Sequence, residues 1–232
     1  MSETAASIMF VHGAWHGGWC WDSVRERLDA LGVPSVAVDN PSVTRPGSDL
    51  DADVANTRAA LDAMPGPVVL VGHSYGGAII SDAASHPNVA QVVFLTAFAL
   101  TPGESVAANS LSGGEESRLG EAIRVDGATT SVDPGRAIEF FFHDCDPEIA
   151  RAAVRRLGPM SVAAMSGTVR DAGWRAKPSS YIVCTDDRAL PLSLQRSCAA
   201  RTTEVIELAT SHSPFLSRPD ELARVLADRA PR

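Results

Sequence analysis

Residues 68–77 read VVLVGHSYGG, an apolar run followed by a serine between glycines. The run Val68–Val71 predicts a buried strand, and a helix is expected from about Gly76 to Ala84. Ser74 therefore lies in a G-x-S-x-G sequence between a strand and a helix, the context that a serine nucleophile of this kind requires. The glycines let the backbone turn without a Cβ clash, and the helix N-terminus stabilises developing negative charge. The alternative is a glycine-rich helix start that Ser74 merely caps.

Strands and helices alternate on both sides of this segment. Further apolar runs predict strands at Ser7–Val11, Val33–Val38, Val92–Leu95, Tyr181–Cys184 and Glu204–Leu208. Apolar residues at helical spacing predict helices at Trp21–Leu31, Leu50–Met64 and Leu192–Ala200, and another that begins near Pro219. Continuous apolar runs without polar alternation fit parallel strands buried on both faces. The sequence thus predicts an α/β fold with a mostly parallel central sheet flanked by helices.

The alternation stops between about Thr101 and Gly173, where we identify no convincing strand. This stretch is too long for a plain loop in a compact domain. Asp133-Pro134 and Asp146-Pro147 are each typical of a helix N-terminus, with an N-cap followed by proline. Because strands resume after Gly173, we expect a single domain over residues 1–232 with a helical cap inserted at about 101–173.

The histidine after the last predicted strand is the candidate general base. A serine hydroxyl is a poor nucleophile until a base takes its proton. In hydrolases with this strand–turn–helix nucleophile, the order is serine, acid, histidine, and the histidine follows the final strand. Of the six histidines, His212 meets these conditions. His12 and His73 are expected to support the site by hydrogen bonding, and an ordinary surface-loop histidine is the alternative for His212.

The remaining parts of such a site are an acid and two oxyanion donors. Asp186 and Asp187 both follow the strand Tyr181–Cys184, and spacing cannot choose which of them orients His212. The backbone amide of Tyr75, directly after the nucleophile, is the first expected donor to the tetrahedral oxyanion. We predict the amide of Ala14, in a glycine-rich loop, as the second. A merely flexible loop is the alternative there.

Composition excludes several other classes of protein. The 232 residues carry a formal net charge of −8, which gives no basic surface for nucleic acid or anionic lipid. No run reaches the roughly 18 apolar residues of a membrane span. Met1–Ala6 is too short and polar for a signal peptide. The four cysteines are spaced without a CxxC pair, so we expect free thiols in a cytoplasmic protein: Cys20, Cys145, Cys184 and Cys198.

No metal or cofactor is expected. The run His143-Asp144-Cys145-Asp146 offers possible ligands, but adjacent residues at a helix entry seldom converge on one ion. The glycines near Gly13 lack the acidic residue of a dinucleotide site. An apolar pocket facing Ser74 would suit a small-molecule ester. The candidate substrate-binding residues are His16, Phe98, Phe141, Met165 and Trp174. Formation of a homodimer is left open.

Three segments carry a family resemblance. Residues 10–21 (FVHGAWHGGWCW), 71–77 (VGHSYGG) and 182–191 (IVCTDDRALP) resemble the α/β-hydrolase branch of plant methylesterases, hydroxynitrile lyases and small bacterial carboxylesterases, including pyrethroid-hydrolysing esterases. The likeness covers nearly the whole chain and is weakest through Thr101–Thr130. It implies a serine hydrolase that cleaves small to medium apolar carboxylic esters through an acyl-enzyme intermediate. The family's T-[ED]-D motif implies Asp187 as the acid, and its oxyanion position after His-Gly agrees with Ala14.

Two other functions are alternatives. In the hydroxynitrile lyases of this branch, a threonine follows the first-strand histidine and a lysine follows the catalytic histidine. This chain has Gly13 and Ser213 at those positions, so hydrolysis is favoured over cyanohydrin cleavage. A ligand receptor on a hydrolase scaffold is the second alternative, and the apparently complete triad argues against it.

Overall fold

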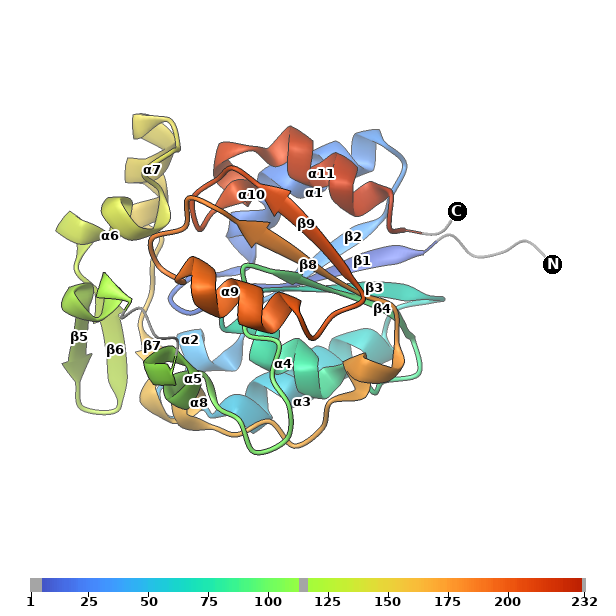
Figure 1. Ribbon diagram of the computed structural model, residues 1–232, viewed down its shortest axis with the longest axis horizontal. Coiled ribbons are helices and arrows are strands. Elements are labelled where there is room, and N and C mark those ends of the chain that lie inside the picture. The colour runs from blue at the N-terminus through green and yellow to red at the C-terminus, as the bar shows by residue number, and fades with distance from the viewer. Residues whose placement is uncertain (1–5, 113–116, 231–232) are drawn as a thin grey trace.

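A six-stranded parallel sheet forms the centre of the protein (Figure 1). The computed structural model describes residues 6–112 and 117–230. The expectation that Met1–Ala6 is not a signal peptide therefore lies almost entirely outside the described residues. The strand order is β2-β1-β3-β4-β8-β9, and every neighbouring pair is parallel. The strands are β1 (Ser7–Val11), β2 (Ser35–Val38), β3 (Val68–His73), β4 (Val89–Leu95), β8 (Ser179–Cys184) and β9 (Glu204–Leu208).

Helices cover both faces of this sheet (Figure 1). One face packs against α1 (Asp22–Ala30), α10 (Pro214–Ser217) and α11 (Pro219–Ala227), and the other against α3 (Leu50–Asp62), α4 (Gly76–Ala83) and α9 (Leu192–Ala199). Alternate strand residues point to opposite faces, so Phe10 of β1 joins the first core and Met9 the second. The short elements α2 (Pro41–Thr44), η1 (Gly18–Trp21) and η3 (Gly173–Ala176) connect them.

All six predicted strands of the central sheet are present. β1 and β9 have the predicted ends, and the others differ by a few residues. The expected burial on both faces holds for β1, β3 and β8, but it is wrong for β2 and β9, whose residues are mostly partly or fully exposed. The reason is their position, because β2 and β9 are the two edges of the sheet.

The described part of residues 101–173 forms a layer beside the carboxyl ends of the strands, at the left and bottom of Figure 1. Its helices are α5 (Val106–Ser112), η2 (Arg118–Ala122), α6 (Pro134–Phe141), α7 (Pro147–Val154) and α8 (Val162–Ser166). The two predicted helix starts are confirmed. Asp133 accepts a hydrogen bond from the Gly135 amide at 2.9 Å, and Asp146 accepts one from Glu148 at 2.8 Å. We call this layer, residues 101–173, the cap.

The expectation that the cap lacks strands is wrong. It contains a small antiparallel sheet of β5 (Ile123–Asp126), β6 (Thr129–Val132) and β7 (Met160–Ser161). β5 and β6 are four residues each and largely exposed, so they lack the apolar run that reveals a buried strand. The signal that could have found them is Asp126-Gly127, a typical hairpin dipeptide, and Gly127 indeed has a φ of 55°.

Two further findings concern expectations from composition. Within the described ranges, no helix has both the length and the apolar character needed to cross a bilayer. The four cysteines are free thiols, with Cys145 half-buried and the other three buried.

Candidate active site

The turn that carries Ser74 is a strained connection between β3 and α4. β3 ends at His73 and α4 begins at Gly76, and Ser74 adopts a φ of 52°. A Cβ added at Gly76 would lie 2.6 Å from the Val11 carbonyl oxygen and 2.7 Å from that of His12. Glycine is therefore required at position 76, because the backbone of the loop after β1 occupies the space of a side chain. Ser74 is held in a left-handed conformation at the start of α4.

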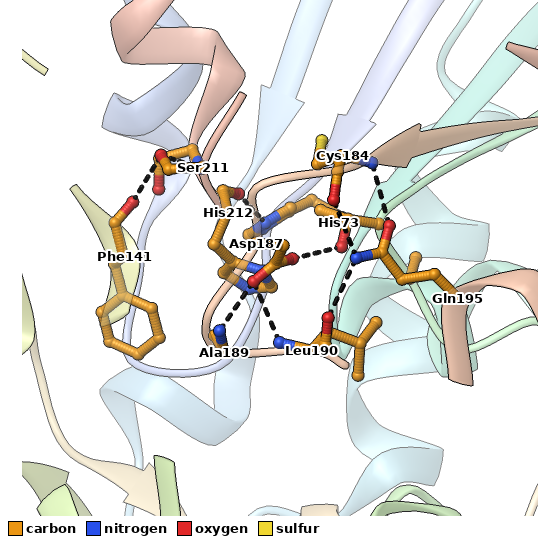
Figure 2. Close-up of polar contacts among 12 residues, drawn as sticks. His73, Phe141, Cys184, Asp187, Ala189, Leu190, Gln195, Ser211 and His212 are labelled. Carbon is orange, nitrogen blue, oxygen red and sulfur yellow. Dashed lines mark hydrogen bonds and ion pairs between the residues drawn. The ribbon is translucent and has the colours of Figure 1, made fainter. Parts of the chain in front are cut away.

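His212 and Asp187 form a hydrogen-bonded pair (Figure 2). His212 Nδ1 lies 2.6 Å from Asp187 Oδ2, and both side chains are almost fully buried. Asp186, which spacing alone could not separate from Asp187, is exposed. The loop after β8 therefore brings Asp187, and not Asp186, to His212.

Backbone and side-chain donors fix the Asp187 carboxylate. Its Oδ1 accepts hydrogen bonds from the amides of Ala189 at 2.7 Å and Leu190 at 2.9 Å. Its Oδ2 accepts a hydrogen bond of 2.5 Å from the Thr96 hydroxyl, in addition to the contact with His212. Sequence reasoning did not identify Thr96, which comes directly after β4 and has no motif of its own.

Gln195 of α9 holds the ends of the loop that carries Asp187 (Figure 2). Its side chain is buried, accepts from the Cys184 amide at 2.9 Å, and donates to the carbonyls of Cys184 at 3.0 Å and Leu190 at 2.9 Å. A buried amide satisfied by three backbone partners restricts both chain segments. Gln195 thereby limits the movement of the Asp187 loop.

Three histidines next to the site are buried and neutral. His73 donates from Nε2 to the His212 carbonyl at 2.9 Å, and the two rings lie 4.5 Å apart. His12 contacts the Gly13 carbonyl through Nδ1 at 2.8 Å, and its Nε2 accepts from the Asn40 amide. Burial lowers the pKa of His73 well below its usual value, and lowers the pKa of His12 to about 4 and that of His16 to about 3. The expectation that His12 and His73 support the site by hydrogen bonding is consistent with these contacts.

Both residues proposed to supply oxyanion amides are held by further hydrogen bonds, Tyr75 by a residue of α3 and Ala14 by a residue of its own loop. The Tyr75 hydroxyl donates to Asp53 Oδ2 at 2.7 Å, and Asp53, fully buried on α3, also accepts from the hydroxyl and amide of Ser42. The Ala14 carbonyl accepts from His16 Nδ1 at 2.8 Å. Ala14, Tyr75, Ser74 and His212 all line one cavity. Asp53 and Ser42 carry no motif that marks them in the sequence, since only the fold brings these helix residues to Tyr75.

This cavity has a volume of about 190 Å³ and a mainly apolar lining. Of the five side chains expected in it, Phe98, Phe141 and Met165 are lining residues. His16 and Trp174 are not among them. Trp174 is buried against Phe94 with ring centroids 5.3 Å apart, and its indole donates to the Leu100 carbonyl. The lining also includes apolar residues that sequence reasoning missed: Trp15, Val106, Leu119, Ile123, Leu190 and Leu194.

His16 lies outside the cavity because it packs among aromatic rings. Its ring centroid lies 5.5 Å from that of Phe141, 5.8 Å from that of Trp19 and 6.1 Å from that of Phe215. Its Nε2 is buried and finds no hydrogen-bond partner among the described residues. His16 thus packs against Phe141, which lines the cavity, without lining it itself.

The end of α6 and the segment between α6 and α7 contact the loops after β8 and β9. The Phe141 carbonyl accepts from the Ser211 hydroxyl at 3.1 Å (Figure 2), and Asp144 accepts from the Ser211 amide at 2.9 Å. His143 Nε2 donates to the Asp186 carbonyl at 2.9 Å. In the part of the chain that the structure describes, no cluster of three or more His, Cys, Asp or Glu side chains could hold a metal ion. His143 and Asp144 connect the cap to the loops after β8 and β9 through these hydrogen bonds.

The fold and the Ser74 turn define a class of enzyme, the α/β hydrolases. A model of the Alpha/beta hydrolase family matches residues 8–225, and the chain belongs to this family. It is 31% identical to a pyrethroid hydrolase of Sphingobium wenxiniae, over 98% of this chain and 88% of the relative. It is 28% identical to Methylesterase 7 of Arabidopsis thaliana, over 96% of this chain and 95% of the relative.

A solved structure agrees with these relatives. The crystal structure of a pyrethroid hydrolase from Sphingobium faniae superimposes with a TM-score of 0.85 at 28% identity, and the match covers 96% of each chain. The resemblance to plant methylesterases and bacterial esterases is therefore confirmed, as is the α/β-hydrolase fold. The protein is a carboxylesterase-like hydrolase.

The close approach at Gly76 leads to a prediction about stability. Gly76→Ala should lower the free energy of unfolding by about 1–3 kcal/mol, because the new methyl meets backbone oxygens that cannot move aside without shifting β1. Urea denaturation at pH 7.5 measures the change. Gly120→Ala is the matched control, since a Cβ there meets no atom within 4 Å. Equal losses in the two variants would contradict the prediction.

Because burial lowers the pKa values of His12 and His16, we predict that the free energy of unfolding falls in acid. Their folded pKa values lie below the unfolded value of about 6.5, so the unfolded chain binds protons first as the pH falls. The stability contributed by neutral His12 and His16 is complete above about pH 6.5 and is lost below it, by about 2 kcal/mol each at pH 5. Urea denaturation between pH 7.5 and 5 measures this loss. In His16→Phe the loss of stability between pH 7.5 and 5 should be smaller than in the native protein by about 2 kcal/mol. An equal loss in the variant and the native protein would contradict the prediction.

Proposed function

We propose that this protein is a serine hydrolase that cleaves small to medium apolar carboxylic esters through an acyl-enzyme intermediate on Ser74. The observation that carries the proposal is the 2.6 Å contact between Asp187 and His212, with His212 and Ser74 lining the same apolar cavity. The family and its named esterase relatives support ester hydrolysis as the type of reaction.

In this mechanism His212 is the general base. The contact with Asp187 keeps the proton of the neutral imidazole on Nδ1, so the lone pair of Nε2 is free to take the Ser74 proton. The Ser74 oxygen then attacks the ester carbonyl carbon. The imidazolium returns the proton to the leaving alcohol, and a water molecule activated by the same nitrogen releases the acid from Ser74.

The tetrahedral intermediates carry a negative oxygen that needs donors. We assign this role to the backbone amides of Ala14 and Tyr75, which come from the loop after β1 and from the start of α4. Amides fixed in place before the reaction stabilise the oxyanion without reorganisation. The contacts of Tyr75 with Asp53 and of Ala14 with His16 support this assignment because they restrict both residues.

The apolar lining of the cavity favours uncharged substrates. Two serines of the cap, Ser110 and Ser117, also line the cavity. Their hydroxyls donate to the carbonyls of Val106 and Ala189, respectively. The described residues that line the cavity include no Asp, Glu, Lys or Arg. A carboxylate or phosphate on the substrate would lose its hydration there without a partner. Its volume of about 190 Å³ exceeds only slightly the roughly 150 Å³ of a cavity that holds benzene, which favours compact acyl or alcohol groups.

The cyanohydrin alternative receives no support from the site. The loop after β1 has Gly13 where the lyases of this branch have threonine, and a Cβ at this position would lie 2.8 Å from Ser74 Cβ. Ser213, where those lyases have lysine, is buried and uncharged. Neither of these two positions therefore offers a cation to a departing cyanide.

The first test is ester turnover by Ser74→Ala. With p-nitrophenyl acetate and butyrate, the variant should lose about 10⁴-fold or more in kcat, because the hydroxyl that forms the covalent bond is absent. Phenylmethylsulfonyl fluoride should inactivate the native protein and add one sulfonyl group by mass spectrometry, and it should leave Ser74→Ala unlabelled. Circular dichroism establishes that the variant is folded. Residual activity within tenfold of the native protein would exclude Ser74 as the nucleophile.

The neighbouring aspartates provide a matched pair for the acid. Asp187→Asn should lower kcat by about 10⁴-fold, because an amide cannot stabilise the imidazolium and favours the wrong tautomer of His212. Asp186→Asn, one residue away and exposed, should stay within about threefold of the native rate. Both are measured with one ester at saturating concentration. Reversed results would move the acid to Asp186, and two active variants would remove the acid from this loop.

A further inference from the structure

The segment directly after β4, Thr96-Ala97-Phe98, contacts both Asp187 and Ser74, the acid and the nucleophile of the proposed triad. The Thr96 hydroxyl donates to Asp187 Oδ2 at 2.5 Å. Two residues later, the Phe98 amide donates to the carbonyl of Ser74 at 3.2 Å. One short stretch of backbone therefore contacts both the residue that carries the acid and the residue that carries the nucleophile.

Thr96 is held in a strained conformation. It has a φ of 37°, and the other non-glycine residues with positive φ in the described chain are Trp15 and Ser74, which both line the cavity. A positive φ is an outlier for a β-branched residue, because the branched Cβ crowds the backbone. Such strain persists where the surrounding structure imposes it, and it concentrates at functional sites. Glycine would remove the strain at position 96, but it would also remove the hydroxyl.

Neighbouring contacts prevent this segment from relaxing. The Thr96 amide donates to the Ile182 carbonyl at 2.8 Å. The hydroxyl of Tyr181, which is fully buried on β8, accepts from the Ala97 amide at 2.9 Å and donates to the Ala97 carbonyl at 2.8 Å. The backbone on both sides of the Thr96 side chain is thus fixed to β8, the strand that leads into the Asp187 loop.

The position of the hydroxyl matters for the charge on Asp187. Asp187 Oδ2 accepts from Thr96 and contacts His212 Nδ1, while Oδ1 accepts from two backbone amides. Each donor fixes the rotation of the carboxylate and also spreads its negative charge. Thr96 shares the oxygen that faces His212, so its hydroxyl has the most direct effect on how firmly Asp187 holds the imidazole.

We propose that Thr96 is a positioning residue of the hydrolytic site, whose hydroxyl orients Asp187 Oδ2 toward His212 and limits the basicity of that oxygen. The strained backbone at position 96 is the conformation that places this hydroxyl on the carboxylate. The inference rests on the proposed triad, and it adds a residue from the segment after β4 that acts through Asp187 without touching the substrate.

The test is the isosteric variant Thr96→Val, which keeps the branched shape and loses the hydroxyl. With p-nitrophenyl butyrate, kcat should fall by about 10- to 100-fold, the effect of losing one hydrogen bond to a charged group, while KM stays within about twofold. The acid limb of the profile of kcat/KM against pH should move upward by about half a unit. The reason is that a carboxylate with one donor fewer holds a proton on His212 more tightly.

Most of the groups near His212 stay in one state across the acid limb, and the exception is His143 of the cap. His143 contacts the Asp186 carbonyl, and burial lowers its pKa below the usual histidine value. His73 and His16, which face His212 from β3 and from the loop after β1, are kept neutral by burial, which lowers the pKa of both. Asp144 of the cap accepts from the Ser211 amide, and its pKa is lowered, so it stays ionised above pH 5. Because His143 is the same in Thr96→Val and Thr96→Ser, a difference in the limb between these two variants reports the Asp187–His212 pair.

Two variants serve as controls. Thr96→Ser keeps the hydroxyl and should restore kcat to within about threefold of the native protein, with the native acid limb. Thr57→Val makes the same isosteric change at another fully buried threonine, on α3, whose hydroxyl has no hydrogen-bond partner among the described residues. It should leave kcat, KM and the pH profile unchanged. If Thr96→Val does not fold, Thr96→Gly removes the hydroxyl together with the backbone strain and should show the same loss of kcat and the same shift.

Three outcomes overturn the inference. The first is a native kcat and acid limb in folded Thr96→Val, with Asp187→Asn inactive; this leaves the proposed function intact and refutes the role of Thr96. The second is equal loss in Thr96→Ser and Thr96→Val with an unmoved acid limb, which assigns Thr96 a purely structural role. The third is full activity of Asp187→Asn, which removes the proposed acid and the inference with it.

Discussion

The hydrogen bond between Asp187 Oδ2 and His212 Nδ1 is the contact on which the rest of the site depends. It joins the loops after β8 and β9, and it lies beside the Ser74 turn after β3. A carboxylate this deeply buried is costly unless its oxygens are satisfied. The contacts of the Asp187 loop follow from that requirement. Two amides of the loop bind one oxygen, Thr96 binds the other, and Gln195 fixes the loop ends. The parallel sheet makes the arrangement possible, because the carboxyl ends of its strands meet at one edge.

The surroundings of this contact are not optimised for stability. Trp15, Ser74 and Thr96 have left-handed conformations that cost free energy in non-glycine residues. His16 and His73 are buried so completely that their charged forms are excluded. Both features are compensated by the apolar cores on the two faces of the sheet, which hold these residues in place. The neutral neighbours place the Asp187–His212 pair in surroundings of low polarity, where its hydrogen bonds are strengthened.

The cap lines part of the cavity and also forms hydrogen bonds with the loops that surround the site. Phe141 lines the cavity with its ring and accepts from the Ser211 hydroxyl with its carbonyl. On the other side, the indole of Trp15 donates to Thr130 of the small sheet at 3.1 Å, and the Trp15 carbonyl accepts from the Gly158 amide. The cap therefore contacts the loop that bears His212 and the loop that bears Ala14. Its residues fix the backbone around the site as well as the size of the space above Ser74.

The sequence by itself determined the central sheet and the identities of the candidate nucleophile and base. Apolar runs placed all six central strands, and G-x-S-x-G between a strand and a helix singled out Ser74. Chain order then singled out His212, because few residues satisfy such local and ordered patterns. Local patterns could not distinguish Asp186 from Asp187, since neighbours in a loop differ in direction and not in spacing. They also misplaced Trp174, whose apolar character fits a core as well as a pocket, and they missed the short, exposed strands of the cap. Only the tertiary structure decided which side chains reach the site from distant positions, among them Thr96, Gln195 and Asp53. Their roles come from hydrogen bonds between residues far apart in the chain, and no local stretch of sequence contains that information.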